Sequence, residues 1–234
     1  MAEPVETVEV DAKGEVTSRY TLVNGLLEGE LTQFGPGGSV SARQHFHAGV
    51  LEGEGSEWSP AGKLVSRAQF RGGLPHGERV AFDDAGRLEQ RVQFVAGKLS
   101  GKAEFFHRGQ LQTEIEFLEG QRHGRFVAYG ETGHPSLACH YKEGELEGEA
   151  SYFGPDGKLL RKANYAAGEL EGEALDYHDN GKVRERSPYR AGKLHGEVQR
   201  YRKNGTLRES QRFEQGQPAG PLRSHDEQGR PLPA

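Results

Sequence analysis

The side chains of this chain that could do chemistry are ten histidines, one cysteine and 35 carboxylates. Histidine is a common metal ligand and proton carrier. His45 and His47 are two residues apart on one face of an extended segment, a spacing that can chelate a metal ion. No Cys, Asp or Glu nearby completes a ligand set that recurs, so we expect no metal site. His76, His123 and His195 each precede a repeated glycine, at a position that other repeats fill with glutamate, serine or alanine. We interpret this position as a polar loop position that accepts any soluble residue.

The remaining chemical candidates also fit structural roles. Cys139, the only cysteine, occupies a position that other repeats fill with Val92 or Ile115, which predicts a small core residue and not a nucleophile. The run Gly35-Pro36-Gly37-Gly38 lacks the following Lys-Ser/Thr and helix of a phosphate loop, and predicts a hairpin turn. No nucleophile, base and oxyanion donor come together in the sequence. We therefore expect no catalytic residue and no cofactor, and a protein that is not an enzyme.

The elements that position these residues repeat with a period of 24 residues, with a single step of 23. The second glycine of a Gly-x-Leu-x-Gly pattern and a further glycine in phase with it define the repeat. These two series are Gly29, Gly53, Gly77, Gly101, Gly124, Gly148, Gly172, Gly196 and Gly220, and Gly14, Gly38, Gly62, Gly86, Gly109, Gly133, Gly157, Gly181, Gly205 and Gly229. A period of this length is typical of stacked supersecondary units. We expect a single array over residues 1–234, with a half repeat at 1–22, repeats over about 23–220 and a cap or half repeat at 221–234.

Each repeat carries the pattern of a β-hairpin. Asn204-Gly205 and its equivalents are turn signals, and the following run alternates, with Leu207, Glu209, Gln211 and Phe213 on one face. The sequence predicts an all-β fold: an elongated, single-layer antiparallel β-meander of tandem 24-residue β-hairpin repeats, with about 18–19 strands and no helix. The 23-residue step falls at the hairpin of residues 105–109 and predicts a local change of turn type or twist.

Charge is distributed unevenly along a chain whose net charge is −5. Residues 1–60 hold three basic and ten acidic residues, whereas residues 176–234 hold twelve basic and eight acidic residues. Without a dense basic stripe we expect no nucleic-acid partner. Glu30, Glu54 and Glu78 begin a column of glutamates at the repeat spacing, which is either a solvated row that resists aggregation or an acidic rail for a basic protein. Trp58, the only tryptophan, lies in an aromatic column. We take Glu30, Glu54, Glu78 and Trp58 as candidate partner-binding residues.

The recurring motif is (Phe/Tyr)-x-x-Gly-x-Leu-x-Gly-Glu, with clean copies at residues 141–149 and 165–173 and Gly-Lys-Leu turns at residues 62–64 and 157–159. Over roughly residues 10–230 the chain resembles the variant MORN repeats of bacterial proteins. The resemblance implies hairpins in a single-layer twisted sheet. Arrays of this variant are similar to the YwqK-like antitoxin family, some of whose members are thought to be immunity partners of toxins. It therefore implies a non-enzymatic protein that binds and occludes a cognate toxin.

An alternative is a MORN-type scaffold or membrane-lipid-associated module. This chain departs from other MORN arrays in its 24-residue period and its higher charge, although a basic stretch at residues 184–203 could contact anionic lipid. The first residues are acidic without an apolar run, no stretch approaches the roughly 18 apolar residues of a membrane span, and the single cysteine favours a reducing compartment. We expect a cytoplasmic protein. An open sheet edge could also pair with a second copy to form a dimer.

Overall fold

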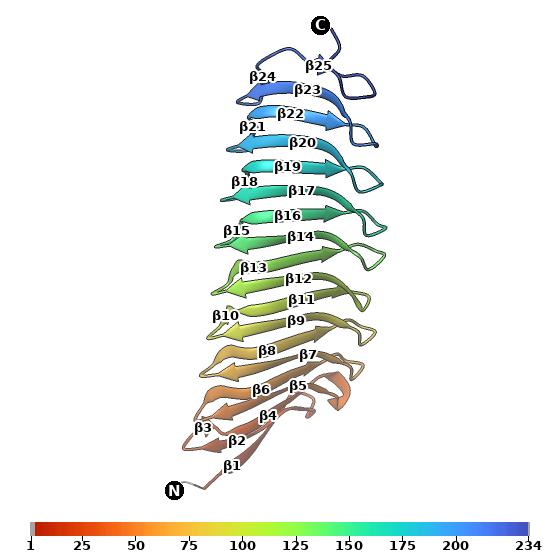
Figure 1. Cartoon of the computed structure of the whole chain (residues 1–234). Helices are drawn as coiled ribbons and strands as arrows, with labels where there is room; N and C mark the ends of the chain where they lie inside the picture. Colours follow the sequence, from red (N-terminus) through yellow and green to blue (C-terminus); the bar gives the residue numbers. More distant parts are fainter. Residues whose placement is uncertain (1–2, 234) are drawn as a thin grey trace. The chain divides into compact units, whose positions relative to one another are not determined.

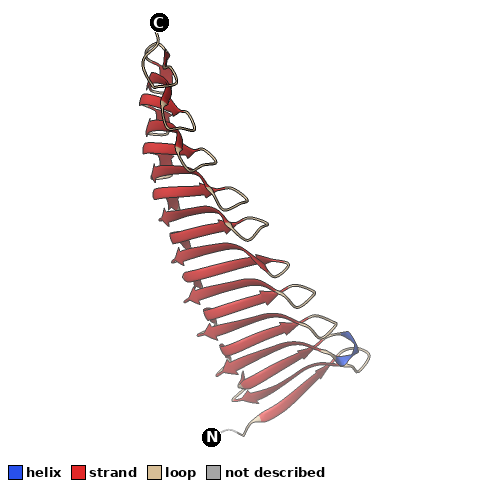
Figure 2. Ribbon diagram, turned by 45° about the vertical axis from the view of Figure 1, so that its right-hand side comes forward, coloured by secondary structure: helices blue, strands red, loops and turns tan. Residues whose placement is uncertain are grey.

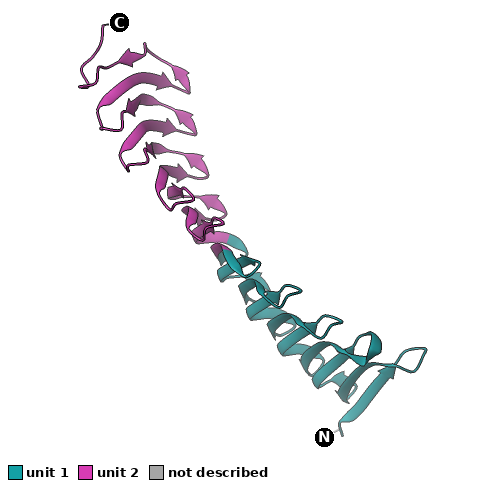
Figure 3. Cartoon of the chain, turned by 90° about the vertical axis from the view of Figure 1, so that its right-hand side faces the viewer, with its two compact units in different colours: residues 1–111, 116–121 teal, residues 112–115, 122–234 magenta. Residues whose placement is uncertain are grey.

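The computed structural model describes residues 3–233, which form strands, turns and one three-residue 3-10 helix (Figure 2). The recorded strand pairings are antiparallel and join consecutive strands as hairpins. The predicted all-β meander of hairpins is therefore confirmed. Contacts divide the chain into two compact units, one of residues 1–111 and 116–121 and the other of residues 112–115 and 122–234 (Figure 3). In each unit the strands lie in one layer. The single array over residues 1–234 stays a prediction.

Twelve strands and the 3-10 helix lie in the first half of the chain (Figure 1). The strands are β1 (Val5–Val10), β2 (Val16–Val23), β3 (Leu26–Leu27), β4 (Gly29–Phe34), β5 (Val40–His47), β6 (Val50–Trp58), β7 (Leu64–Arg71), β8 (Leu74–Phe82), β9 (Leu88–Val95), β10 (Lys98–Leu99), β11 (Gly101–His107) and β12 (Gln110–Leu118). Strand β12 contributes residues to both units. The 3-10 helix, Pro36–Gly38, is the turn predicted for the glycine-rich run and joins β4 to β5.

Thirteen strands follow in the second unit. They are β13 (Gln121–Tyr129), β14 (Pro135–Lys142), β15 (Glu145–Leu146), β16 (Gly148–Phe153), β17 (Leu159–Ala166), β18 (Glu169–Leu170), β19 (Gly172–Tyr177), β20 (Val183–Arg190), β21 (Lys193–Leu194), β22 (Gly196–Tyr201), β23 (Leu207–Glu214), β24 (Gln217–Pro218) and β25 (Arg223–Ser224). Six of the seven two-residue strands account for the count of 25, because each of the six pairs with the same neighbour as the strand that follows it. When each of these six short strands is counted as one with the strand that follows it, the number of strands is 19, within the predicted range of about 18–19.

Two kinds of turn alternate along the chain, and in each unit they lie on opposite sides of the strands (Figure 1). In the two-residue turns both central residues have positive φ, as in Ala191 (φ 46°) and Gly192 (φ 72°). The longer loops are closed by two backbone hydrogen bonds, and glycine alone has positive φ. We expected Asn204-Gly205 to be a tight turn, but it lies in a longer loop, where only Gly205 has positive φ (96°). The tight turns lie instead at the first glycine of the motif.

The 23-residue step changes the turn type, as predicted. Between β11 and β12 the chain turns through Arg108 (φ 51°) and Gly109 (φ 80°), a two-residue turn at a position where other repeats have a longer loop. A side chain with positive φ is strained relative to glycine or asparagine. The shorter turn thus absorbs the missing residue, and β11 and β12, with 7 and 9 residues, are each one residue longer than β16 and β17, which have 6 and 8.

The leucine and the second glycine of the motif each lie opposite an aromatic residue of a neighbouring strand. Leu170 lies opposite Tyr165, and Gly172 lies opposite Tyr189 on the next strand. Between them the chain bulges: the N–H of Glu171 donates to the carbonyl oxygen of Asn164 at 2.9 Å, and Gly172 takes φ 81°. The positive φ favours glycine at this position, and the glycine therefore allows the bulge.

The residue between leucine and glycine holds the next turn in place. The N–H of Ala191 donates to Oε2 of Glu171 at 2.8 Å, and the N–H of Gly192 donates to the carbonyl oxygen of Leu170 at 2.9 Å. The same carboxylate bond to the turn one repeat later is made by Glu28, Glu52 and Glu147. We interpreted the position before the second glycine as one that accepts any soluble residue. The structure gives it a more specific role, because its carboxylate accepts a hydrogen bond from a turn N–H. His76 reaches the equivalent N–H with Nδ1 at 3.4 Å.

A row of small side chains forms the core. These side chains follow one another about every twelve residues and are 5% exposed or less: Val80, Val92, Ala103, Ile115, Val127, Cys139, Ala150, Ala163, Ala174, Ser187, Val198 and Ser210. The aromatic residues beside them are only half-buried. In a single layer, a small side chain is covered by larger neighbours two residues away on the same face. Cys139 is 4% exposed, as predicted for a core residue, and its burial raises the pKa of the thiol.

The end of the second unit caps its own outer strand. After β25 the chain turns back, so that His225 pairs with Pro231 and the N–H of Leu232 donates to the carbonyl oxygen of Ser224 at 2.9 Å. Pro231 and Pro233 have no N–H to offer to a further strand. The cap or half repeat that the sequence predicts at residues 221–234 stays a prediction, and the structure describes this segment up to residue 233.

Candidate partner-binding face

Strands β4, β6 and β8 bring all four candidate residues to one face of the first unit. The cross-strand register runs from Thr32 through Arg43, Ser56 and Arg67 to Val80. Cross-strand partners share a face, and so do residues two apart on one strand. Glu30, Glu54 and Glu78 each lie two residues before a member of this row, and Trp58 lies two residues after one.

Three rows of side chains cross this face at the repeat spacing. The acidic row is Glu30, Glu54 and Glu78, the basic row is Arg19, Arg43, Arg67 and Arg91, and the aromatic row is Phe34, Trp58 and Phe82. Members of one row are two strands apart, about 10 Å. We call these three rows the charged face. The sequence analysis missed the basic row, although its period of 24 residues was visible.

The acidic row is partly neutralised by the basic row. Arg43 Nε lies 3.8 Å from Glu30 Oε1, and Arg91 Nε lies 3.6 Å from Glu78 Oε2. Glu54 accepts hydrogen bonds from Gln69 Nε2 at 3.3 Å and Ser56 Oγ at 3.2 Å. The paired side chains are 42–51% exposed, and such surface pairs add little stability. They orient the charges toward solvent, where a partner can replace them.

Arginines of the basic row also lie over rings of the aromatic row. The guanidinium carbon of Arg43 is 5.7 Å from the centroid of the Trp58 ring, and that of Arg19 is 5.5 Å from the centroid of the Phe34 ring. Both distances are in the range of cation–π attraction. Trp58 is half-buried, so one part of its surface is packed and the rest stays accessible.

The second unit repeats the acidic and basic rows and adds a ladder of charges. Lys162 Nζ lies 2.8 Å from Glu149 and Arg186 Nε lies 3.1 Å from Glu173. On its other face Arg200 Nε lies 2.7 Å from Glu185, and its Nη1 lies 3.5 Å from Glu209. Burial tends to raise the pKa of Glu185, but hydrogen bonds from Arg200 and Ser187 and the charges of Arg200 and Arg184 together outweigh it, so the pKa is lowered.

The histidines do not gather into a metal site in the part of the chain that is described, where no group of three or more His, Cys, Asp or Glu could hold a metal ion. His47 Nδ1 lies 2.9 Å from Glu28 Oε1, and His45 lies opposite Glu30. The N–H of Ala48 and the ring of His47 lower the pKa of Glu28. The carboxylates nearest to the His45/His47 pair are therefore Glu28, which contacts His47, and Glu30, which lies across the strand from His45.

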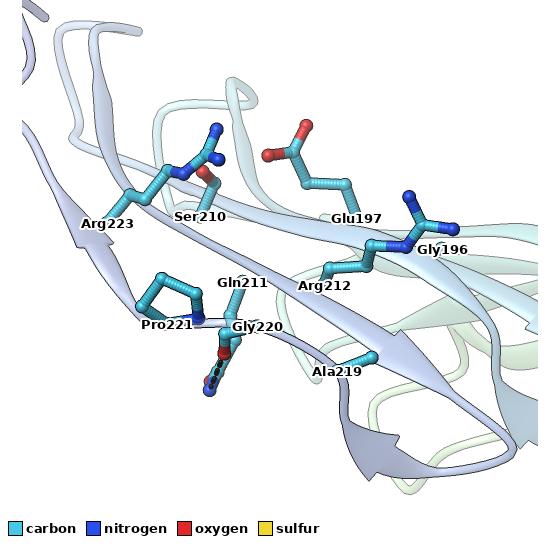
Figure 4. Close-up of a pocket in the computed structure, with 9 residues that line it drawn as sticks. All are labelled: Gly196, Glu197, Ser210, Gln211, Arg212, Ala219, Gly220, Pro221 and Arg223. Carbon is cyan, nitrogen blue, oxygen red and sulfur yellow. Dashed lines mark hydrogen bonds between the residues drawn. The ribbon is translucent and has the colours of Figure 1, made fainter.

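A depression lies beside β23 and the segment that joins β24 to β25 (Figure 4). Its walls include Arg212, Arg223, Glu197 and Pro221. Gln211 Nε2 donates to the carbonyl oxygen of Gly220 at 3.4 Å. The side chains of Arg212, Arg223 and Glu197 extend to one side of the strands, away from Pro221 (Figure 4). Charges of both signs thus line this depression.

With hairpin repeats and a patterned face in place, the chain falls in the class of β-hairpin repeat proteins. Residues 146–167 and 170–191 match the family model described as the MORN repeat variant. The chain therefore carries MORN-variant repeats in its second unit. Each matched segment begins at the leucine of a Leu-x-Gly bulge, contains one longer loop and ends at the first residue of the next tight turn. No curated protein sequence is a significant match.

Two of the matching solved structures are distant in sequence and in fold. Crystal structures of TcdB2-TccC3-Cdc42 and of TcdB2-TccC3-TEV match 98% and 96% of this chain at 10% identity, each with a TM-score of 0.22. This chain spans about 16% of the length of the chains that it matches. TM-scores this low support no argument about fold or function. No helix among residues 3–233 is long and apolar enough to cross a membrane.

Proposed function

We propose that this chain is a non-enzymatic protein-binding repeat protein and that the charged face of its first unit receives the partner. The observation that carries the proposal is the alignment of three rows, acidic, basic and aromatic, on one face at a common spacing of two strands. A repeated surface of this kind suits a large partner. Tryptophan and arginine together are the residue types that dominate protein interfaces.

The particular role that we propose is that of an immunity protein, or antitoxin, that neutralises a cognate toxin by covering its surface. This role rests on the resemblance of the repeat motif to the YwqK-like antitoxin family. Occlusion needs no catalytic group on this chain. A toxin with a basic patch would find both carboxylates for its cations and a tryptophan for apolar contact, and its arrival would displace the weak Arg–Glu pairs of the charged face.

The basic stretch near residues 184–203 gives little support to lipid binding. Arg186, Arg200 and Lys203 lie 3.1, 2.7 and 2.8 Å from carboxylates, and Arg202 donates to the carbonyl oxygens of Leu207 and His225. Binding to an anionic membrane would have to compete with these contacts.

Affinity capture of the tagged chain from its native host, followed by mass spectrometry and co-expression, tests the proposal. One stoichiometric protein that is toxic alone and harmless together with this chain would support immunity. A stoichiometric protein without toxicity would support protein binding and overturn the antitoxin role. Recovery of lipid alone, with sedimentation on anionic liposomes, would overturn both.

Substitutions on the charged face then locate the partner. We expect Trp58→Ala to weaken the complex by on the order of thirtyfold, the scale of an interface hot spot, and Glu54→Lys to weaken it with a loss that shrinks at high salt. Tyr177→Ala is the matched control, because Tyr177 fills the position of Trp58 in the second unit. Equal losses for Trp58→Ala and Tyr177→Ala would overturn the choice of face.

A further inference from the structure

The outer edge of the first unit is strand β1. It pairs with β2 from Val5, opposite Leu22, to Val10, opposite Val16. Among residues 3–233 no strand pairs with its other side (Figure 1). Backbone groups of an antiparallel strand point alternately to either side, so β1 presents N–H and C=O groups that no strand of the described residues satisfies.

The edge at the end of the second unit is protected and β1 is not. There the chain folds back over β25 and places Pro231 opposite His225, so that a further strand would lack the N–H donor of this residue. Strand β1 has no proline between Val5 and Val10, and it pairs regularly with β2 from Val5 to Glu9 before the register shifts at Val10. An edge strand without proline is a template for strand addition.

The side chains of β1 suit an added strand. Val8 is 53% exposed and Val10 is 57% exposed, and these two residues share a face with Glu6 because they lie two and four positions after it. β-Branched side chains favour strand pairing, since they pack against cross-strand neighbours. A neighbouring strand would cover the two valines, which β2 covers only in part.

The negative charge of β1 favours a basic strand as the one that pairs with it. The carboxylate of Glu6 makes no ion pair or hydrogen bond with other described residues. Glu9 accepts hydrogen bonds from Ser18 Oγ at 2.6 Å and Tyr20 Oη at 2.9 Å, which lower its pKa and keep it ionised. Residues 1–60 hold ten acidic residues against three basic ones. Opposite charges across two strands attract and like charges repel.

We propose that β1 is the docking edge for an extended basic segment of a protein partner, which adds to the sheet as a further strand. A lysine or arginine of that segment lies opposite Glu6, and apolar side chains cover Val8 and Val10. This inference rests on the proposed protein-binding function and names the segment that is bound. A second copy is the weaker occupant, because two paired β1 strands bring four carboxylates, Glu6 and Glu9 of each, into one two-stranded ribbon.

A synthetic peptide of alternating lysine and valine tests the proposal on the 234-residue chain. Methyl groups on alternate backbone nitrogens leave the peptide one edge that can pair and prevent it from aggregating. The same peptide methylated on every nitrogen has no such edge and is the control. Fluorescence anisotropy gives the affinity, and amide hydrogen exchange shows which residues the peptide protects.

We expect the half-methylated peptide to bind, to slow exchange at residues 5–10 and to lose affinity with salt. Glu6→Lys should weaken binding about threefold to tenfold, the range for losing a cross-strand ion pair and gaining a repulsive one. Glu169→Lys, the same change on exposed strand β18 of the second unit, should leave the affinity unchanged.

Three results would overturn the proposal. The first is binding without slower exchange in β1, or no binding. The second is equal affinity for the fully methylated peptide. The third is a dimer of the free chain in sedimentation with β1 already protected, which would identify a second copy as the occupant. None of them affects the test of Trp58 and Glu54 on the charged face, so failure at the edge is distinguishable from failure of protein binding.

Discussion

Substituting Gly196 by alanine should destabilise the second unit by far more than the same change at an equivalent glycine. Gly196 has φ 124°, and a Cβ built there would lie 2.8 Å from Cγ of Pro188. The backbone strain of a side chain in this region is of order 1–3 kcal/mol, and forcing an extra carbon into a packed site adds a comparable amount. We expect a loss of about 3 kcal/mol in the free energy of unfolding.

Gly172 provides the matched control. It occupies the same position of the previous repeat with φ 81°, and a Cβ there meets no atom within 4 Å. Only the left-handed backbone then contributes, so Gly172→Ala should cost about 1 kcal/mol. Urea unfolding followed by circular dichroism measures both losses, provided that the slope of the transition is unchanged.

A double-mutant cycle isolates the contact with the proline ring. Pro188→Ala removes Cγ, so Gly196→Ala should cost about 1 kcal/mol less in that background than in the natural chain. The strain of the backbone remains, and the double variant should not regain full stability. Equal losses at Gly196 and Gly172, or a coupling energy of zero, would refute the argument that close packing at Pro188 requires glycine.

Three further predictions follow from the turns. Glu171→Ala removes the acceptor of the Ala191 N–H and should speed amide exchange at that turn at least severalfold, while turns elsewhere exchange as before. Arg108→Asn should stabilise the chain by roughly 0.5–1 kcal/mol in urea, because asparagine tolerates the φ of 51° better; destabilisation would contradict the assigned turn. Hydrogen bonds from the next turn and from Arg87 lower the pKa values of Glu28 and Asp83 in the folded chain. Their contribution is present above the pKa of the unfolded chain and is lost as pH falls through the folded values, so the urea midpoint should drop below about pH 4.

The repeat and the strands could be predicted because both follow from local patterns. Glycine at a fixed period marks the positions where φ must be positive, and alternation such as Glu209, Gln211 and Phe213 marks a strand. The alternation fails at Leu207, which pairs with Tyr201 across a register shift of one residue. An extra residue in one strand depends on the twist of its partner, so the sequence of one strand alone does not reveal it.

The bonds between successive repeats could not be read from the sequence. The role of Glu171 becomes visible only when the turn at Ala191 and Gly192, twenty residues later, is placed above it. Likewise, the spacing of Glu30 and Glu54 predicted an acidic column, but the arginine that faces Glu30 comes from the register of β4 with β5. That the four candidate residues share one face follows from the register of the strands and was not predicted; whether they bind a partner stays a prediction.

The two kinds of turn differ in how well they tolerate changes of sequence and length. A two-residue turn such as Ala191-Gly192 donates two N–H groups to a carboxylate and a carbonyl oxygen of the repeat before it, so an inserted residue there would displace both donors from their acceptors at once. The longer loops instead close mainly on themselves, as Ser59 does with Lys63 at 2.8 Å. A graft of foreign sequence, or the natural drift of such arrays toward a new target, is therefore expected at the loops and not at the tight turns.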